Sequence, residues 1–116
     1  MKSGKTMKES DLAEMRDLRR KLHQFPEVGF NVHETKSVVA EELRRYGLEA
    51  HVGAGVVGLL KAGSGNRAIG LRADMDALPI TEASTHDYVS KRQGAMHACG
   101  HDGHTVMLLA AAKALS

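Results

Sequence analysis

The sequence contains very little cysteine, which excludes one way of holding a small fold together. Cys99 is the only cysteine among 116 residues, so no internal disulfide can form. A chain without disulfides is typical of proteins from a reducing compartment. We therefore expect a cytoplasmic protein whose stability comes from its core.

Aromatic residues, long apolar runs and net charge are also scarce. Aromatic residues make up 3% of the sequence and tryptophan is absent, so the core must be built mainly from leucine, valine, alanine and methionine. No apolar run approaches the roughly 18 residues that a membrane span requires. A formal net charge of +2 gives no indication of nucleic acid or a membrane surface as a partner. We expect neither.

Hydrophobic residues nevertheless account for 42% of the sequence, enough for a core. Their spacing of three and four predicts a first helix over residues 11–25, which Ser10 or Asp11 could cap. The preceding residues 1–10 are expected to form a flexible tail. This division leaves residues 11–116 as the folded unit.

Two further helices and a set of strands complete the predicted elements. A second helix is predicted from about 34 to 46, with a glycine directly after it as the stop. Residues 48–52 and 56–62 have the composition of strands, and we expect the second to form a hairpin with residues 67–73. The almost wholly apolar segment 103–115 predicts a helix whose composition suits full burial.

One motif invites a nucleotide-binding interpretation that its surroundings do not support. The letters "GAGVVG" at 53–58 match the glycine fingerprint of dinucleotide-binding proteins, and Asp74 follows at a suitable distance. That fingerprint needs a helix directly after the glycines, whereas here "GSG" interrupts the chain at 63–65. We interpret these glycines as turn residues.

Two carboxylates follow the last predicted strand, within "LRADMDALP" at 71–79. At a strand end, Asp74 and Asp76 could bind a metal ion or orient a ligand. They could equally be turn residues that cap the loop before Pro79. Taken alone, these residues leave both interpretations open.

The segment "HACGHDGH" at 97–104 is the strongest indication of chemistry. Cys99 and His101 can reach one cation from a tight, glycine-containing loop, and a thiolate with an imidazole suits zinc, manganese, cobalt or a similar divalent ion. Asp102 and His104 could orient the imidazoles. In the alternative interpretation, Cys99 is a small buried hydrophobe and the histidines are caps or surface residues. The remaining histidines are interpreted as structural or solvated: His23, His33, His51 and His86.

Three segments together resemble a known family. "LRRKLHQFPEVGF", "LRADMDALPI" and "GAMHACGHDGHTVMLLAAAKAL" occur in the order and spacing of amidohydrolases of the hippurate-hydrolase and indole-acetyl-amino-acid-hydrolase type. These belong to the aminoacylase and carboxypeptidase-like metallopeptidase superfamily. The resemblance runs from about Leu12 to Leu115. It implies an α/β fold, the N-terminal part of a zinc-peptidase-like catalytic domain with a central sheet flanked by helices, without the lid and dimerisation domain.

The resemblance also implies an activity. Members of the family hydrolyse the amide bond of N-acyl amino acids, such as hippurate-like or N-acetyl substrates. They use two divalent ions, for which Mn, Zn and Co are the candidates. The expected partner is thus a small N-acyl amino acid, and a homo-oligomer is one expectation for the full-length form.

The family pattern suggests roles for the singled-out residues. Cys99 and His101 inherit the positions of metal ligands, with Cys99 bridging the two ions. Asp76 takes the place of the catalytic-site carboxylate that orients other groups. Asp74 stands where some relatives have a histidine ligand. A role in supporting the ligands or contacting substrate is expected for Asp74, His97, Asp102 and His104.

Other parts of the family pattern have no counterpart in these 116 residues. The glutamate that acts as general base, a glutamate ligand and two histidine ligands follow further downstream in the family. Glu82 is the nearest glutamate, but it matches no catalytic position. We therefore expect this chain alone to be inactive. The alternative function is a non-catalytic truncated fragment that binds one metal weakly or associates with another chain.

Overall fold

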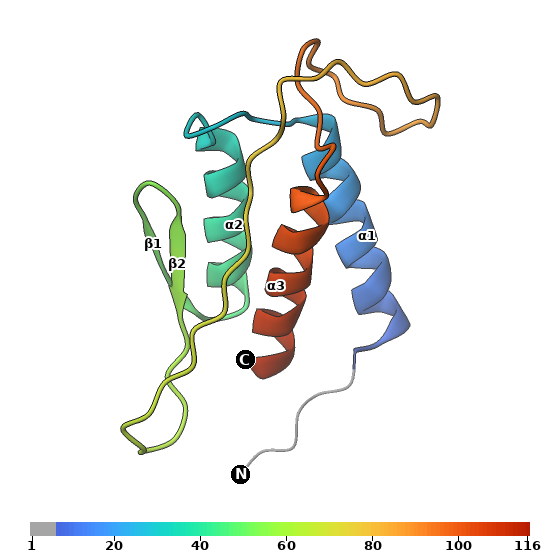
Figure 1. The fold of residues 1–116 in the computed structure, drawn as a ribbon. Helices are drawn as coiled ribbons and strands as arrows, with labels where there is room; N and C mark the ends of the chain where they lie inside the picture. The colour runs from blue at the N-terminus through green and yellow to red at the C-terminus, as the bar shows by residue number, and fades with distance from the viewer. Residues whose placement is uncertain (1–6) are drawn as a thin grey trace.

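The computed structural model describes residues 7–116, and within them three helices pack beside a two-stranded antiparallel ribbon (Figure 1). The helices are α1 (Glu9–Gln24), α2 (His33–Arg45) and α3 (His101–Leu115), and the strands are β1 (Glu49–Val52) and β2 (Val56–Leu59). Helix α3 contacts both α1 and α2, and both strands contact α2. The chain is therefore a mixed unit in which α3 is the central helix.

Helix α1 begins earlier than predicted and is capped differently. Lys8 is the N-cap, and the Asp11 carboxylate accepts the Lys8 backbone N–H at 3.1 Å from within the first turn. The prediction that Ser10 or Asp11 is itself the cap is therefore wrong. Residues 1–6 of the expected tail lie outside the described residues, and residues 9 and 10 belong to α1.

Helix α2 ends at the glycine that the sequence predicts. Gly47 has a φ of 90°, a conformation that side chains with a Cβ rarely adopt. Its N–H donates to the Arg44 carbonyl and the Leu48 N–H donates to the Leu43 carbonyl, both at 3.0 Å. This pair of bonds satisfies carbonyls at the helix end and turns the chain into β1.

The strand pairing differs from the prediction. β1 pairs with β2, with Glu49 opposite Leu59 and Val52 opposite Val56. Residues 67–73 contain no strand and do not pair with β2, so the predicted hairpin is wrong. An extended segment becomes a strand only where neighbouring backbone offers hydrogen-bond partners. The short turn after β1 brings that partner to β2, whereas residues 67–73 are extended and almost wholly exposed.

The core forms where α3 meets the other two helices. Its buried apolar residues are Met15, Leu22, Val39, Leu43, Leu48, Val106 and Leu109. The expectation of a fully buried α3 is wrong, because α1 and α2 cover only part of its circumference and Met107 remains 63% exposed. No helix in the described part of the chain combines the length and the apolar composition needed to cross a membrane.

A segment without regular structure carries the two aspartates to the start of α3. In Figure 1 the chain after β2 runs past α2 and α3 toward the irregular loop 81–95. The Ala77 N–H donates to the Glu27 carbonyl at 2.7 Å, and Leu78 and Met96 exchange backbone bonds at 2.9 and 3.0 Å. These bonds fix residues 74–78 beside the N-terminal end of α3.

Candidate metal centre

His101 is the first residue of α3, and Asp76 sets the orientation of its ring. His101 Nδ1 lies 2.9 Å from the Asp76 backbone oxygen and 3.0 Å from its Oδ1. Both partners are acceptors, so Nδ1 is the donor in these contacts, and in the neutral tautomer that fits them Nε2 carries the lone pair. An imidazole held in this way is prepared to bind a metal through Nε2. The contact supports the orienting role expected for Asp76.

Asp74 is the second carboxylate beside this imidazole. Its Oδ2 lies 3.5 Å from His101 Nε2, while its Oδ1 pairs with Arg72 at 2.8 Å. Two ligand atoms that each bind one ion at 2.0–2.2 Å are about 3–3.5 Å apart. One cation could therefore contact both groups. The Thr105 hydroxyl lies 2.8 Å from the backbone oxygens of Asp74 and of His101, which holds this segment against α3.

Cys99 and His104 both face solvent. Cys99 is a free, exposed thiol, so its interpretation as a buried hydrophobe is wrong. Gly100 follows it with a φ of 86°, and this left-handed residue turns the loop into α3. The ring centre of His104 lies 5.6 Å from that of His101. His104 also borders a shallow groove of about 370 Å³ lined by Leu71, Arg72, Ala73, Asp74, Met107, Leu108 and Ala111.

His97 is buried in the same loop, with 4% of its surface exposed. Burial lowers the pKa of His97, so the ring is neutral near pH 7. Neither of its ring nitrogens has a hydrogen-bond partner among the described residues. Leaving such a group unpaired costs about 1–3 kcal/mol. The supporting role expected for His97 thus has no partner within residues 7–116.

Asp102 contacts α1 rather than the histidines of its own loop. Its fully buried Oδ2 forms an ion pair with Arg19 Nε at 2.9 Å and accepts a hydrogen bond from His23 Nδ1 at 2.8 Å. Its Oδ1 accepts the Gly103 N–H at 2.9 Å. The negative charge also suits the first turn of α3. Asp102 therefore anchors the start of α3, and with it His101, to α1.

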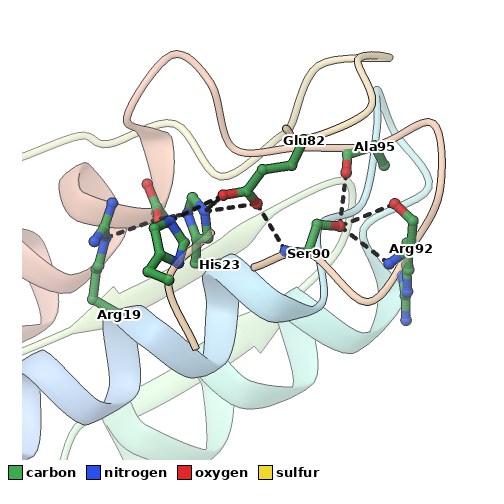
Figure 2. A network of polar contacts seen from close by, with 8 residues as sticks. Arg19, His23, Glu82, Ser90, Arg92 and Ala95 are labelled. Atoms are coloured by element: carbon green, nitrogen blue, oxygen red, sulfur yellow. Dashed lines mark hydrogen bonds and ion pairs between the residues drawn. The ribbon is translucent and has the colours of Figure 1, made fainter. Parts of the chain in front are cut away.

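A second group of metal-capable side chains was not expected from the sequence. His23, Glu82 and His86 each offer one ligand atom, and these atoms lie within 4.8 Å of one another. Figure 2 shows the His23 and Glu82 side chains pointing toward each other, with Ser90 on the far side of the carboxylate. No spacing motif joins the end of α1 to loop 81–95, so sequence reasoning had no signal for this cluster.

The donor atoms around His101 suit a divalent ion. An exposed thiol, an imidazole and a carboxylate beside that imidazole are the donor types of a mixed S, N and O site. Zinc, manganese and cobalt all accept such ligands. Cys99, His101 and Asp74 do not form a three-ligand cluster among the described residues, so further ligands would have to complete the site.

Comparison with known proteins agrees with this chemistry. The sequence profile of peptidase family M20/M25/M40 matches residues 70–116. The hippurate hydrolase of Campylobacter jejuni is 49% identical over 106 residues, which cover 89% of this chain and 28% of that enzyme. An N-acyl-L-amino acid amidohydrolase from Geobacillus stearothermophilus is 46% identical over 101 residues, covering 84% of this chain and 27% of that enzyme.

A solved structure shares the fold. The Bacillus subtilis YXEP protein, described as a dinuclear metal-binding peptidase of the M20 family, superposes with a TM-score of 0.85 at 34% identity. The match covers 89% of this chain and 30% of that one. The expected fold class is confirmed, and the chain spans about 28% of the length of the curated relatives that it matches. By sequence and by fold, the chain resembles part of the proteins of peptidase family M20/M25/M40, and its curated relatives include amidohydrolases.

Proposed function

We propose that these residues form one side of a two-metal centre that hydrolyses the amide bond of N-acyl amino acids in the whole protein. The observation that carries the proposal is the His101 ring, which Asp76 holds with Nε2 free. The names of the two curated relatives support hippurate-like or N-acetyl substrates. The dinuclear relative supports a pair of ions, and Mn, Zn or Co suits the donor atoms.

Each residue has a defined part in this proposal. The Cys99 thiolate and His101 Nε2 would hold the metal. Asp76 keeps the proton on Nδ1 of His101, and Asp74 adds negative charge beside Nε2. His104 borders the groove where substrate would lie. The bound ions would polarise the scissile carbonyl and lower the pKa of water.

We also propose that residues 1–116 do not complete the reaction by themselves. Two glutamates have side chains that are almost fully buried, and both are committed elsewhere. Glu27 accepts the Glu34 and Thr35 N–H groups, and Glu82 contacts His23, His86 and Ser90. Neither is placed to take a proton beside His101. A cytoplasmic location and a homo-oligomeric whole protein complete the proposal.

A second candidate function is a fragment that binds one metal weakly or associates with another chain. Large apolar side chains remain uncovered, with Phe30 87% and Ile69 90% exposed. Exposed apolar surface of this kind favours association. Sedimentation of the purified chain over a range of concentrations tests this alternative directly.

A chimeric enzyme tests the catalytic proposal. This chain would replace the 49% identical segment of the Campylobacter hippurate hydrolase, and hippurate hydrolysis would be measured with added Mn²⁺, Zn²⁺ or Co²⁺. We expect activity in the chimera and none in the isolated chain. Cys99→Ser and His101→Gln should each lower kcat at least about 100-fold, because each removes a direct metal ligand.

His33→Gln is the matched control, since His33 is an exposed histidine at the start of α2. Its chimera should retain full activity. Activity that survives both ligand substitutions would refute the proposed roles of Cys99 and His101. Hydrolysis by the isolated chain would refute the proposal that residues 1–116 are insufficient.

A further inference from the structure

We propose that His23, Glu82 and His86 form a second divalent-metal site of the zinc type, which fastens loop 81–95 to the end of α1. The three side chains come from two segments far apart in the sequence. Their ligand atoms lie within 4.8 Å of one another. Two imidazoles and one carboxylate are an established ligand set for zinc, with a fourth position left for water.

The distances around Glu82 suit one shared ion. His23 Nε2 lies 3.0 Å from Glu82 Oε1, and His86 Nε2 lies 3.1 Å from Glu82 Oε2. Ligand atoms bound to one zinc ion are separated by about 3–3.5 Å, so only small shifts are needed to admit the ion. The side chains of His23 and Glu82 are almost fully buried, and that of His86 is one-third exposed, which leaves a route of entry.

The first imidazole is already oriented by a carboxylate. His23 Nδ1 donates to Asp102 Oδ2 at 2.8 Å, so its opposite nitrogen, Nε2, is directed at Glu82 (Figure 2). A carboxylate behind a histidine, with the ion in front of it, is the usual arrangement of zinc-binding imidazoles. His23 Nε2 therefore faces the Glu82 carboxylate, and the ion would lie between these two groups.

The second imidazole and the carboxylate are held by separate contacts. The His86 ring stacks on Tyr88 with ring centres 3.9 Å apart, and Arg20 lies over the same tyrosine at 4.6 Å. His86 Nε2 is the nitrogen that lies beside Glu82, whereas His86 Nδ1 is buried and has no hydrogen-bond partner among the described residues. Glu82 Oε1, the oxygen that lies 3.0 Å from His23 Nε2, also accepts the Ser90 N–H at 2.7 Å, which fixes the carboxylate.

Zinc titration of a chain that lacks the other candidate ligands tests the proposal. The protein is the 116-residue chain carrying Cys99→Ser and His101→Gln, and the probes are Zn²⁺ by calorimetry and Co²⁺ by visible absorption. We expect saturable binding of one ion per chain and release of a proton on binding. Adding His86→Leu should weaken binding at least about 100-fold, because one of three protein ligands is removed.

His51→Leu in the same background is the matched control. His51 is an exposed histidine with the Glu49 carboxylate 3.6 Å away, but the described residues offer it no third ligand. Its affinity should stay within about twofold. Helix content measured by circular dichroism must be equal in the variants, and His86→Asn replaces His86→Leu if the latter unfolds.

Two results would overturn the proposal. One is the absence of saturable binding once Cys99 and His101 are replaced. The other is equal affinity with and without the His86 side chain in two folded variants. Neither result bears on hydrolysis by the chimera, so this inference and the proposed function can fail independently.

Discussion

Replacing Asp102 by asparagine tests the contact that joins the start of α3 to α1. The substitution keeps the shape of the side chain and removes its charge. The amide oxygen can still accept hydrogen bonds, but the amide nitrogen must then face either the Arg19 and His23 donors or the Gly103 N–H. At least one buried donor therefore loses its acceptor.

The size of the effect follows from burial. Removing one member of a buried ion pair costs about 3–5 kcal/mol. The Asp102 side chain is fully buried, whereas that of Arg19 is 37% exposed and can regain contact with water. The free energy of unfolding should therefore fall by about 3 kcal/mol, the lower end of this range. Small domains have about 5–15 kcal/mol of stability in total. The melting temperature should fall by about 10–20 °C.

Urea unfolding followed by far-ultraviolet circular dichroism measures this loss. Asp17→Asn is the matched control, because Asp17 pairs with Arg16 on the surface with 68% of its side chain exposed. Exposed pairs contribute little, so its midpoint should be that of the wild type. If Asp102→Asn unfolded at the same urea concentration as Asp17→Asn, the anchoring role assigned to Asp102 would be refuted.

Three further predictions follow from local contacts. Burial raises the pKa of Glu27, but hydrogen bonds from the start of α2 outweigh burial, so the net pKa of Glu27 lies below its ordinary 4.5. The Glu27 charge therefore stabilises the fold fully above pH 4.5. This stabilisation is lost as the pH falls through the pKa of Glu27 in the folded protein. Glu27→Gln should therefore cost about 1–2 kcal/mol in urea unfolding at pH 7, and this cost should shrink as the pH falls below 4.5. Gly47→Ala should cost about 1–2 kcal/mol because of its positive φ, whereas Gly53→Ala should melt like the wild type. Asp76→Asn should weaken Co²⁺ binding only about 10-fold, since the Asp76 backbone oxygen still accepts the proton of the His101 ring. The measurement uses a chain that also carries His86→Leu, which removes a ligand of the second proposed metal site.

Each of these predictions has a clear contrary outcome. A cost of Glu27→Gln that is independent of pH would show that its charge does not cap α2. Equal melting temperatures for the two glycine variants would contradict the conformational argument. A cobalt affinity unchanged by Asp76→Asn would remove the support that Asp76 lends to the proposed metal centre.

Local patterns in the sequence were sufficient for the helices. Apolar spacing predicted all three to within about two residues at each end, because helical periodicity and stop signals depend only on neighbours in the chain. The loop 81–95 was also predicted as irregular. The pairing of 56–62 with 67–73 was predicted wrongly, because periodicity indicates an extended segment without saying which backbone lies beside it.

The candidate site divides in the same way. The composition of "HACGHDGH" and the order of three motifs were enough to indicate a resemblance to a metal-binding hydrolase family, and the comparisons agree with that resemblance. The resemblance suggested that Asp76 orients groups of the site, but only the fold shows that its partner is His101. The partners of Asp102 and the exposure of Cys99 could not be predicted from neighbours in the sequence.

The sequence by itself determined the helices, the metal-capable loop and the family, because these depend on residue types and short spacings. Only the tertiary structure decided which side chains meet. His23 and Glu82 are 59 positions apart in the sequence, about half of the chain, yet they lie 3.0 Å apart because α1 packs on α3 and loop 81–95 folds over the end of α1. Contacts of this range depend on how helices pack, and helix packing is a property of the whole core rather than of any one segment.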